Sequence, residues 1–396
     1  MGAGSSVGPS ENATPERWVA LDVLRLVAVV LMVQGHTFTA LLDPVFREGA
    51  WVRPHGYLHG LTAPMFLFAS GLAFGVATLR RWPEHVRIGS ASKRRFERYG
   101  WLLFIGYALS LPEMSLRRLF GEAGVDNART FFRVDALENI GVSLLVLQGL
   151  VLVLKRPGRF MIAAVVLGTG LIFLAPAAWR MPVEALLPLP IAAYVNVNTG
   201  SILPLFPWAG FIFAGVLTAY CCLDRSMSLR PYRALGLGVA GLVLWSAASA
   251  LEQSGLNWFG EHNYWKTSPV FFFVRLGLLL LGLSVLCFGE ALVARGSTAP
   301  KSHATGWMAR AAQETLVIYV THLFLLYGSP INHGVARFYR NDLSIAMASV
   351  VALLILSVSV GVALCWRYAR DHDPVRFRRF QKGTALLVVL VALFKP

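Results

Sequence analysis

The sequence predicts an all-α integral membrane protein, a polytopic bundle of about ten or eleven transmembrane helices with its N-terminus in the cytoplasm. Hydrophobic residues make up 56% of the 396 residues and charged residues 14%, whereas soluble proteins carry about 25% charged residues. Apolar runs of spanning length recur along the chain, and Lys and Arg concentrate in alternate connections. The regular alternation that a membrane β-barrel needs is absent from the sequence.

The apolar runs define the expected spans. A helix needs about 20 largely apolar residues to cross a bilayer, and breaks rich in Pro, Gly and charge separate such runs here. A further run, 384–394, is shorter than a spanning helix, so we interpret it as a tilted or partial eleventh helix whose crossing stays open. The ten expected spans are 18–42, 58–79, 99–113, 134–154, 160–178, 204–222, 234–253, 269–294, 313–329 and 344–365.

The orientation follows from the connections between these spans. With the N-terminus inside, the inner connections carry 22 Lys and Arg and the outer ones carry 10. Because cytoplasmic loops hold an excess of these residues, this bias predicts a cytoplasmic N-terminus. The connection 80–98 contributes most to it. Residues 1–17 are expected to form a flexible cytoplasmic tail and 18–395 one transmembrane domain, integral to the cell (inner) membrane.

Composition also indicates which classes of partner the protein is expected to bind. The net charge of +15 does not indicate nucleic-acid binding, because that needs a basic patch on a water-exposed fold. Membrane lipids are the expected surroundings, and a homo-oligomer stays open. The cysteines have no metal-type spacing and no paired outer positions, so we interpret them as packing residues and predict no metal. They are Cys221, Cys222, Cys287 and Cys365.

Ionisable residues inside spans are the informative exceptions. Each costs at least a few kcal/mol in lipid, so it is expected to face a cavity or a partner. The first span contains Asp22, Arg25, Gln34 and His36. Arg25 and His36 lie about three turns apart on one face, with an axial separation of roughly 16 Å. The alternative is that Arg25 extends to the interface while His36 bonds a neighbouring backbone.

Later segments add further polar groups. His55 and His59 are four residues apart, so their rings could share a helix face, although no third metal ligand is suggested locally. Arg275 interrupts an apolar run and needs an anion, either from the protein or from a ligand phosphate. The candidate protein anions are Asp22, Asp135, Glu138 and Glu314. In the ninth span, Tyr319 and His322 follow Glu314, and His322 is as well explained by a structural role as by a site.

Several of these motifs resemble a known superfamily. The segment 21–25, together with Met32 and His36, resembles the first helix of the transmembrane acyltransferase superfamily. The segment 55–62 is similar to the stretch around the active histidine of the heparan-α-glucosaminide N-acetyltransferase catalytic-domain family. In that comparison His55 matches the histidine, and His59 replaces an Asn. An Asp that follows in the family is absent here.

Three more blocks support the resemblance, which extends from about residue 17 to residue 365. They are 132–141 with Asp135 and Glu138, 203–211 with Trp208, and 316–323 with Tyr319 and His322. Each motif alone has low specificity, whereas together and in this order they favour the superfamily.

The resemblance implies a membrane-bound acyltransferase. Such an enzyme takes an acyl group, acetyl in the simplest case, from a cytoplasmic thioester such as acetyl-CoA. It delivers the group to a hydroxyl or amine of a carbohydrate or other small acceptor at the outer face. The family motif favours His55 as general base or transiently acylated nucleophile, and the position opposite Arg25 favours His36.

The remaining polar residues are given supporting roles by the same resemblance. Arg25 and Arg275 are expected to hold donor phosphates or the thioester carbonyl. Asp135, Glu138 or Glu314 is expected to orient a histidine. The further supporting polar residues are Asp22, His59, Trp208, Tyr319 and His322.

Two other functions stay open at this point. Membrane-embedded Arg, His and Glu also occur in transporters and flippases of small polar or glycan substrates. Against that alternative, the spans show no inverted repeat and no matched pair of broken helices. An accessory protein that has lost the chemistry is the other alternative, because the Asp of the family motif is missing.

Overall fold

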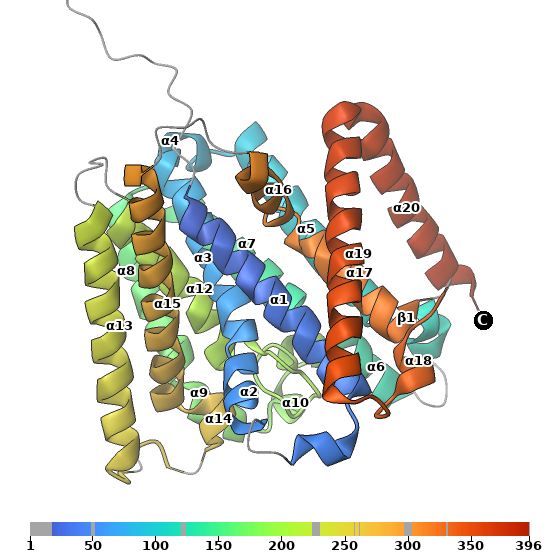
Figure 1. Cartoon of the computed structure of the whole chain (residues 1–396), viewed down its shortest axis with the longest axis horizontal. Helices are drawn as coiled ribbons and strands as arrows, with labels where there is room; N and C mark the ends of the chain where they lie inside the picture. The colour runs from blue at the N-terminus through green and yellow to red at the C-terminus, as the bar shows by residue number, and fades with distance from the viewer. Residues whose placement is uncertain are drawn as a thin grey trace, which may run out of the picture.

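Helices account for nearly all of the chain that the structure describes. The computed structural model describes residues 18–48, 52–119, 124–223, 230–256, 258–260, 262–296, 303–329 and 332–395. The predicted tail lies outside these residues. The long helices stand side by side as a bundle, with short helices and loops at both ends (Figure 1). The prediction of an all-α, multi-pass membrane protein is therefore confirmed.

Seven helical stretches in the described part of the chain are long and apolar enough to cross a membrane. Two shorter apolar helices, α8 (Pro157–Phe173) and α17 (Thr315–Tyr327), run beside them. These nine coincide with nine of the predicted spans. The seven are α1 (Val19–Leu41), the stretch Pro54–Arg80 formed by α2 (Val52–His59) and α3 (Thr62–Arg80), α7 (Ala136–Leu154), α12 (Leu205–Cys222), α13 (Arg230–Gln253), α15 (Pro269–Gly296) and α19 (Ile345–His372).

Two further long helices begin with a basic segment and continue apolar. They are α5 (Ser90–Leu109), whose second half contains most of the predicted span 99–113, and α20 (Pro374–Phe394). The run 384–394 is the second half of α20, which turns back beside α19 (Figure 1). Its far end bonds the loop that follows α5, because Leu116 N donates to Ala392 O at 2.8 Å. The helix therefore runs from one end of the bundle to the other.

Short elements close the two ends. The end that carries the start of α1 has the excess of Lys and Arg in its connections, and we name it the inner end. It holds α4 (Trp82–His85) and α16 (His303–Ala311) (Figure 1). The opposite, outer end holds η1 (Pro44–Arg47), η2 (Pro112–Met114), η3 (Arg117–Leu119), α6 (Gly124–Phe132), α9 (Ala175–Arg180), α10 (Val183–Leu186), α11 (Leu189–Ala192), α14 (Tyr264–Thr267), β1 (Gly328–Ser329), β2 (Asn332–His333) and α18 (Ala336–Tyr339).

Glycines allow the closest helix contacts. A Cβ at Gly71 of α3 would lie 1.9 Å from Ile212 O of α12, and one at Gly215 of α12 would lie 2.2 Å from Phe68 O of α3. Because lipid is as apolar as the side chains, helices in membranes associate by such close packing rather than by a hydrophobic driving force. The α3 and α12 pair therefore depends on two small residues, and it forms part of the largest core cluster.

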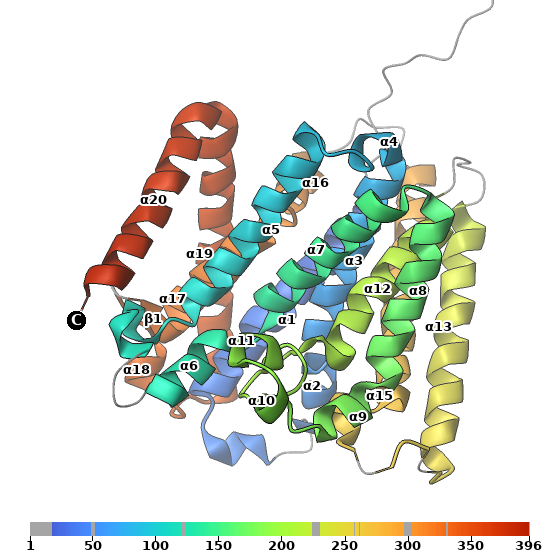
Figure 2. The ribbon, with the colours of Figure 1, turned by 180° about the vertical axis from the view of Figure 1, so that it is seen from behind.

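Helix α1 lies between the two halves of the bundle (Figures 1 and 2). It packs against α3, α15, α17 and α19. Its inner end is fixed by Glu290 of α15, whose carboxylate accepts from Val19 N at 3.2 Å and Ala20 N at 3.0 Å. These backbone groups have no partner within their own helix, and a carboxylate also suits the positive end of the helix dipole. The outer half of α1 packs against both α2 and α17.

Candidate functional site

The polar residues of the outer half of α1 contact histidines on two other helices. Gln34 Nε2 lies 2.7 Å from His55 Nε2 of α2. His36 Nδ1 lies 3.0 Å from His322 Nε2 of α17. Residues two apart on a helix point in different directions, so α1 reaches α2 with one side and α17 with another. The distant segments 55–59 and 322 thus meet at one helix.

His59 completes this group by packing over the backbone of α1. A Cβ at Gly35 would lie 1.7 Å from His59 Nε2, so the ring occupies the space that any side chain at Gly35 would fill. Thr62 Oγ1 lies 3.4 Å from His59 Nδ1, and the rings of His55 and His59 are 6.0 Å apart. We name these four side chains the histidine cluster: His36, His55, His59 and His322.

The pair formed by His36 and His322 has a defined proton arrangement. His322 is fully buried, and its Nδ1 lies 3.2 Å from Ile318 O, which is an acceptor. Nδ1 of His322 therefore carries a proton, and in the neutral ring Nε2 then accepts from His36 Nδ1. This tautomer leaves the lone pair of His36 on Nε2. A histidine held in this way is suited to general-base catalysis.

Arg275 lies near the outer end of α15. Its side chain is buried and contacts aromatic rings. Its guanidinium is 3.9 Å from the ring centre of Phe271 and 5.3 Å from that of Trp208. Among the residues that the structure describes, no carboxylate forms an ion pair with it. The sequence predicted that an anion from the protein or from a ligand would be the partner of Arg275. In the structure the described partners of this side chain are aromatic rings, which form cation–π contacts with it.

The indole of Trp208 faces the same guanidinium, and its Nε1 has no hydrogen-bond partner among the described residues. Trp208 and Arg275 line a narrow crevice with Lys266 and Ser268. Close by, outside the spans, burial raises the pKa of Tyr264, and its hydrogen bond to Glu252 raises it further.

The structure does not bring the two predicted donor-binding arginines together. Arg25 lies near the inner end of α1, where Nη1 is 4.0 Å from Asp22 Oδ1. Arg275 lies toward the outer end of α15 (Pro269–Gly296), a helix that runs in the opposite direction (Figure 1). The two cations therefore belong to different ends of the bundle, and Arg25 alone is near the inner face.

The predicted orienting carboxylates bond elsewhere in the described chain. Asp135 and Glu138 form a capping box at the start of α7, in which Glu138 Oε2 accepts from Asp135 N at 3.0 Å. Glu314 precedes α17 and binds Arg370 of α19 through both oxygens, at 3.0 and 2.5 Å. The histidines instead bond Gln34, Thr62, each other and a backbone carbonyl.

Two residues that contact the histidine cluster were not among the site residues predicted from the sequence. Gln34 is a partner of His55, and its polarity within a span was the available signal. Tyr327 lies with its ring 6.4 Å from that of His36, but an aromatic residue at a span end is common at membrane interfaces. Within the described residues, no three His, Cys, Asp or Glu side chains gather as a metal site.

Comparison with known proteins identifies the family. The sequence model described as "Heparan-alpha-glucosaminide N-acetyltransferase, catalytic" matches residues 17–237. A search of the curated proteins found no match. The matched range includes Gln34, His36, His55 and His59, whereas Arg275 and His322 lie beyond it. More than half of the chain is covered, and the protein therefore belongs to the heparan-α-glucosaminide N-acetyltransferase catalytic family, a family of membrane acyltransferases.

Proposed function

We propose that the protein transfers an acyl group, acetyl in the simplest case, from a cytoplasmic CoA thioester to a hydroxyl or amine at the outer face. The observation that carries this proposal is the histidine cluster, which lies in the outer half of a bundle of the matching family. The acceptor would be a carbohydrate or another small molecule. The membrane would be the cell membrane.

The inner end supplies cations for a donor that carries phosphates. Arg95 of α5 is half-buried and donates to Thr78 Oγ1 at 2.9 Å and to Gln148 Oε1 at 3.0 Å. Both acceptors are neutral, so its positive charge is not cancelled by them. Arg25 lies at the same end. Arginine is well suited to phosphate because its planar donors form paired hydrogen bonds.

The chemistry assigned to the cluster balances as a simple acyl transfer. The acceptor oxygen or nitrogen attacks the thioester carbonyl carbon, forming the new C–O or C–N bond, and the C–S bond breaks. His36 Nε2 takes the acceptor proton and returns it to the departing sulfur, so free CoA leaves as a thiol. Alternatively, a ring nitrogen of His55 attacks the thioester carbonyl carbon, the C–S bond breaks, and CoA leaves as a thiol with the ring N–H proton. The acceptor then attacks the acyl carbon, the C–N bond to His55 breaks, and the acceptor proton returns to the ring.

The test is transfer from labelled acetyl-CoA in membranes that contain His36→Ala or His55→Ala. We expect each loss to reduce transfer about 100-fold or more, as for other acid–base groups. His262→Ala is the matched control, because His262 lies at the outer end and bonds a backbone carbonyl of its own loop. Full activity in both cluster variants would exclude the proposal.

A second measurement separates this proposal from a transporter. The purified protein is expected to bind acetyl-CoA and to release CoA slowly in the absence of an acceptor. A simple exporter or flippase would do neither. Failure of the purified wild-type protein to bind acetyl-CoA would therefore favour transport over acyl transfer.

A further inference from the structure

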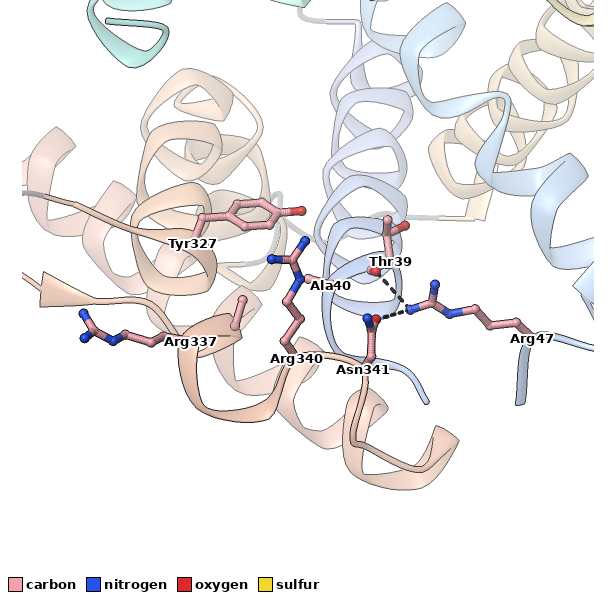
Figure 3. Close-up of a pocket in the computed structure, with 8 residues that line it drawn as sticks. Thr39, Ala40, Arg47, Tyr327, Arg337, Arg340 and Asn341 are labelled. Carbon is pink, nitrogen blue, oxygen red and sulfur yellow. Dashed lines mark hydrogen bonds between the residues drawn. The ribbon is translucent and has the colours of Figure 1, made fainter. Parts of the chain in front are cut away.

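A pocket of about 520 Å³ opens at the outer end of the bundle. Four elements form it: the last turn of α1 with Thr39 and Ala40, the end of η1 with Arg47, the end of α17 with Tyr327, and the segment in and after α18 (Figure 3). The volume is within the range of small-molecule sites. None of the assigned candidate residues lines it.

The pocket lies directly outside the pair formed by His36 and His322. Thr39 and Ala40 follow His36 by three and four residues, so they lie on the same face of α1, one turn closer to the outer surface. Tyr327 lies between the two, because it lines the pocket and its ring is 6.4 Å from that of His36. A molecule seated in the pocket is therefore one helical turn from the proposed general base.

The pocket is positively charged. Among the described residues that line it there is no carboxylate, whereas three are arginines: Arg47, Arg337 and Arg340. Arg47 bonds Thr39 O and Asn341 Oδ1, and Arg337 bonds His333 Nδ1. Arg340 has no hydrogen-bond or ion-pair partner among the described residues.

Figure 3 shows the guanidinium of Arg340 directed toward Tyr327, whereas Arg337 points away. Three like charges without a carboxylate repel one another, and a bound anion removes that cost. The planar donors of arginine fit the tetrahedral oxygens of phosphate. Arg340 is the side chain best placed to bind such a group.

Apolar side chains surround this charge at the level where the membrane meets water. The rim elements η1 and α18 expose Val45 (75%), Phe338 (64%) and Tyr339 (49%). Helix α1 ends at Leu41, so the pocket lies at the outer limit of its span. Exposed aromatic residues beside arginines are typical of the headgroup region. A water-soluble anion gains little from these apolar neighbours, whereas a lipid contacts both them and the arginines.

We propose that this pocket binds the phosphate of an outer-leaflet lipid and that this lipid carries the hydroxyl or amine that is acylated. The second part rests on the proposed acyl transfer. The first part concerns binding alone and can be measured without any activity.

The binding test uses the full-length protein in detergent and native mass spectrometry with three ligands. These are phosphatidylglycerol, diacylglycerol with the same chains but no phosphate, and inorganic phosphate. We expect the wild type to retain phosphatidylglycerol best, and Arg340→Gln to retain it about fivefold less, in keeping with the loss of one cation beside an anionic lipid. Arg340→Lys, which keeps the charge, should recover part of the binding.

Arg129→Gln is the matched control, because Arg129 is an outer-end arginine that pairs with Glu184 at the surface at 2.7 Å. Its loss should leave lipid retention unchanged. Equal retention of diacylglycerol, or equal loss in Arg340→Gln and Arg129→Gln, would overturn the proposal. Inorganic phosphate that binds as well as the lipid would assign the pocket to a free anion instead.

Acyl transfer then separates the two proposals. With a phospholipid acceptor, Arg340→Gln should raise the KM for the lipid and leave the KM for acetyl-CoA unchanged. Lipid binding that depends on Arg340, with no transfer by the wild type, would remove the acyltransferase proposal and keep the site. Transfer to a water-soluble sugar that is unaffected by Arg340→Gln would remove the lipid acceptor and keep the enzyme.

Discussion

At the scale of single residues, Gly35 determines where a cluster histidine lies. The ring of His59 occupies the space of the missing Cβ, so Gly35→Ala must displace either the ring or α2. Misplacing a group by about 1 Å in an active site can cost about 100-fold in rate, and we expect a loss of that order in acyl transfer. The measurement is transfer in membranes at equal protein levels.

Gly149→Ala provides the comparison for Gly35→Ala. Gly149 also lies inside a long helix, and a Cβ there meets nothing within 4 Å. We expect this variant to retain wild-type transfer, because alanine suits a helix interior. Equal transfer by both variants would show that the position of His59 does not matter for the reaction.

His322 is predicted to act through His36 rather than on the substrate. It accepts from His36 Nδ1 and is itself fixed by Ile318 O. We expect His322→Ala to lower kcat by about 100-fold with little change in the KM for acetyl-CoA. His322→Gln retains an acceptor and should recover part of the rate. If the KM for acetyl-CoA rises as much as kcat falls, or Gln recovers nothing, His322 has a merely structural role.

At the scale of elements, the contact between α3 and α12 is the most sensitive to volume. A Cβ at Gly215 would lie 2.2 Å from the carbonyl oxygen of Phe68, a backbone atom that cannot move alone. Gly215→Ala should therefore lower stability by about 1–3 kcal/mol, the usual cost of overpacking. Thermal unfolding in detergent measures it. Gly236→Ala, where a Cβ meets nothing within 4 Å, should unfold like the wild type.

Helix α20 shows how a short apolar run can belong to a longer helix. The sequence predicts a tilted or partial helix for the run 384–394, because this run is shorter than a spanning helix. In the structure it continues a helix of 21 residues. Its far end is tied to the outer loop, since Lys395 Nζ donates to Glu113 O at 2.6 Å. The apolar pattern marks only the second half of this helix, whereas its basic first half begins at a local cap, in which Asp373 Oδ1 accepts from Arg376 N at 3.0 Å.

At the scale of the whole molecule, the bias of Lys and Arg predicts that the end of α20 lies at the outer face. In a protein whose four cysteines are replaced by serine, Lys395→Cys should react with a membrane-impermeant maleimide added to intact cells. Ile88→Cys, in the inner connection and 80% exposed, should react after the membrane is opened and not before. If Ile88→Cys reacted in intact cells and Lys395→Cys did not, the orientation would be the opposite one. If neither cysteine reacted in intact cells, the end of α20 would not lie at the outer face.

Two groups of polar residues lie toward opposite ends of the bundle. Arg25 and Arg95 lie toward the inner end, and the histidine cluster, Arg275 and the basic pocket lie toward the outer end. Two helices connect these regions: α1 carries both Arg25 and His36, and α3 contacts Arg95 through Thr78 and His59 through Thr62. Under the proposed acyl transfer, the inner region would receive the donor and the outer region the acceptor.

The sequence by itself determined the helical class, nine of the spans and the family, and it predicts the orientation. These follow from local properties: the length of an apolar run, the bias of Lys and Arg, and short motifs such as the one at His55. It also identified His36, His55, His59 and His322 as exceptional, since each carries a polar ring into or beside a span.

Only the tertiary structure decided which of these residues meet. It paired His36 with His322 across 286 positions, gave His55 the partner Gln34, and assigned Asp135, Glu138 and Glu314 to helix caps and ion pairs. It also separated Arg25 from Arg275 and revealed the pocket around Arg340. The reason is physical: periodicity shows which face of a helix is polar, but the neighbour of that face depends on how the helices pack, and in lipid that packing is set by shape.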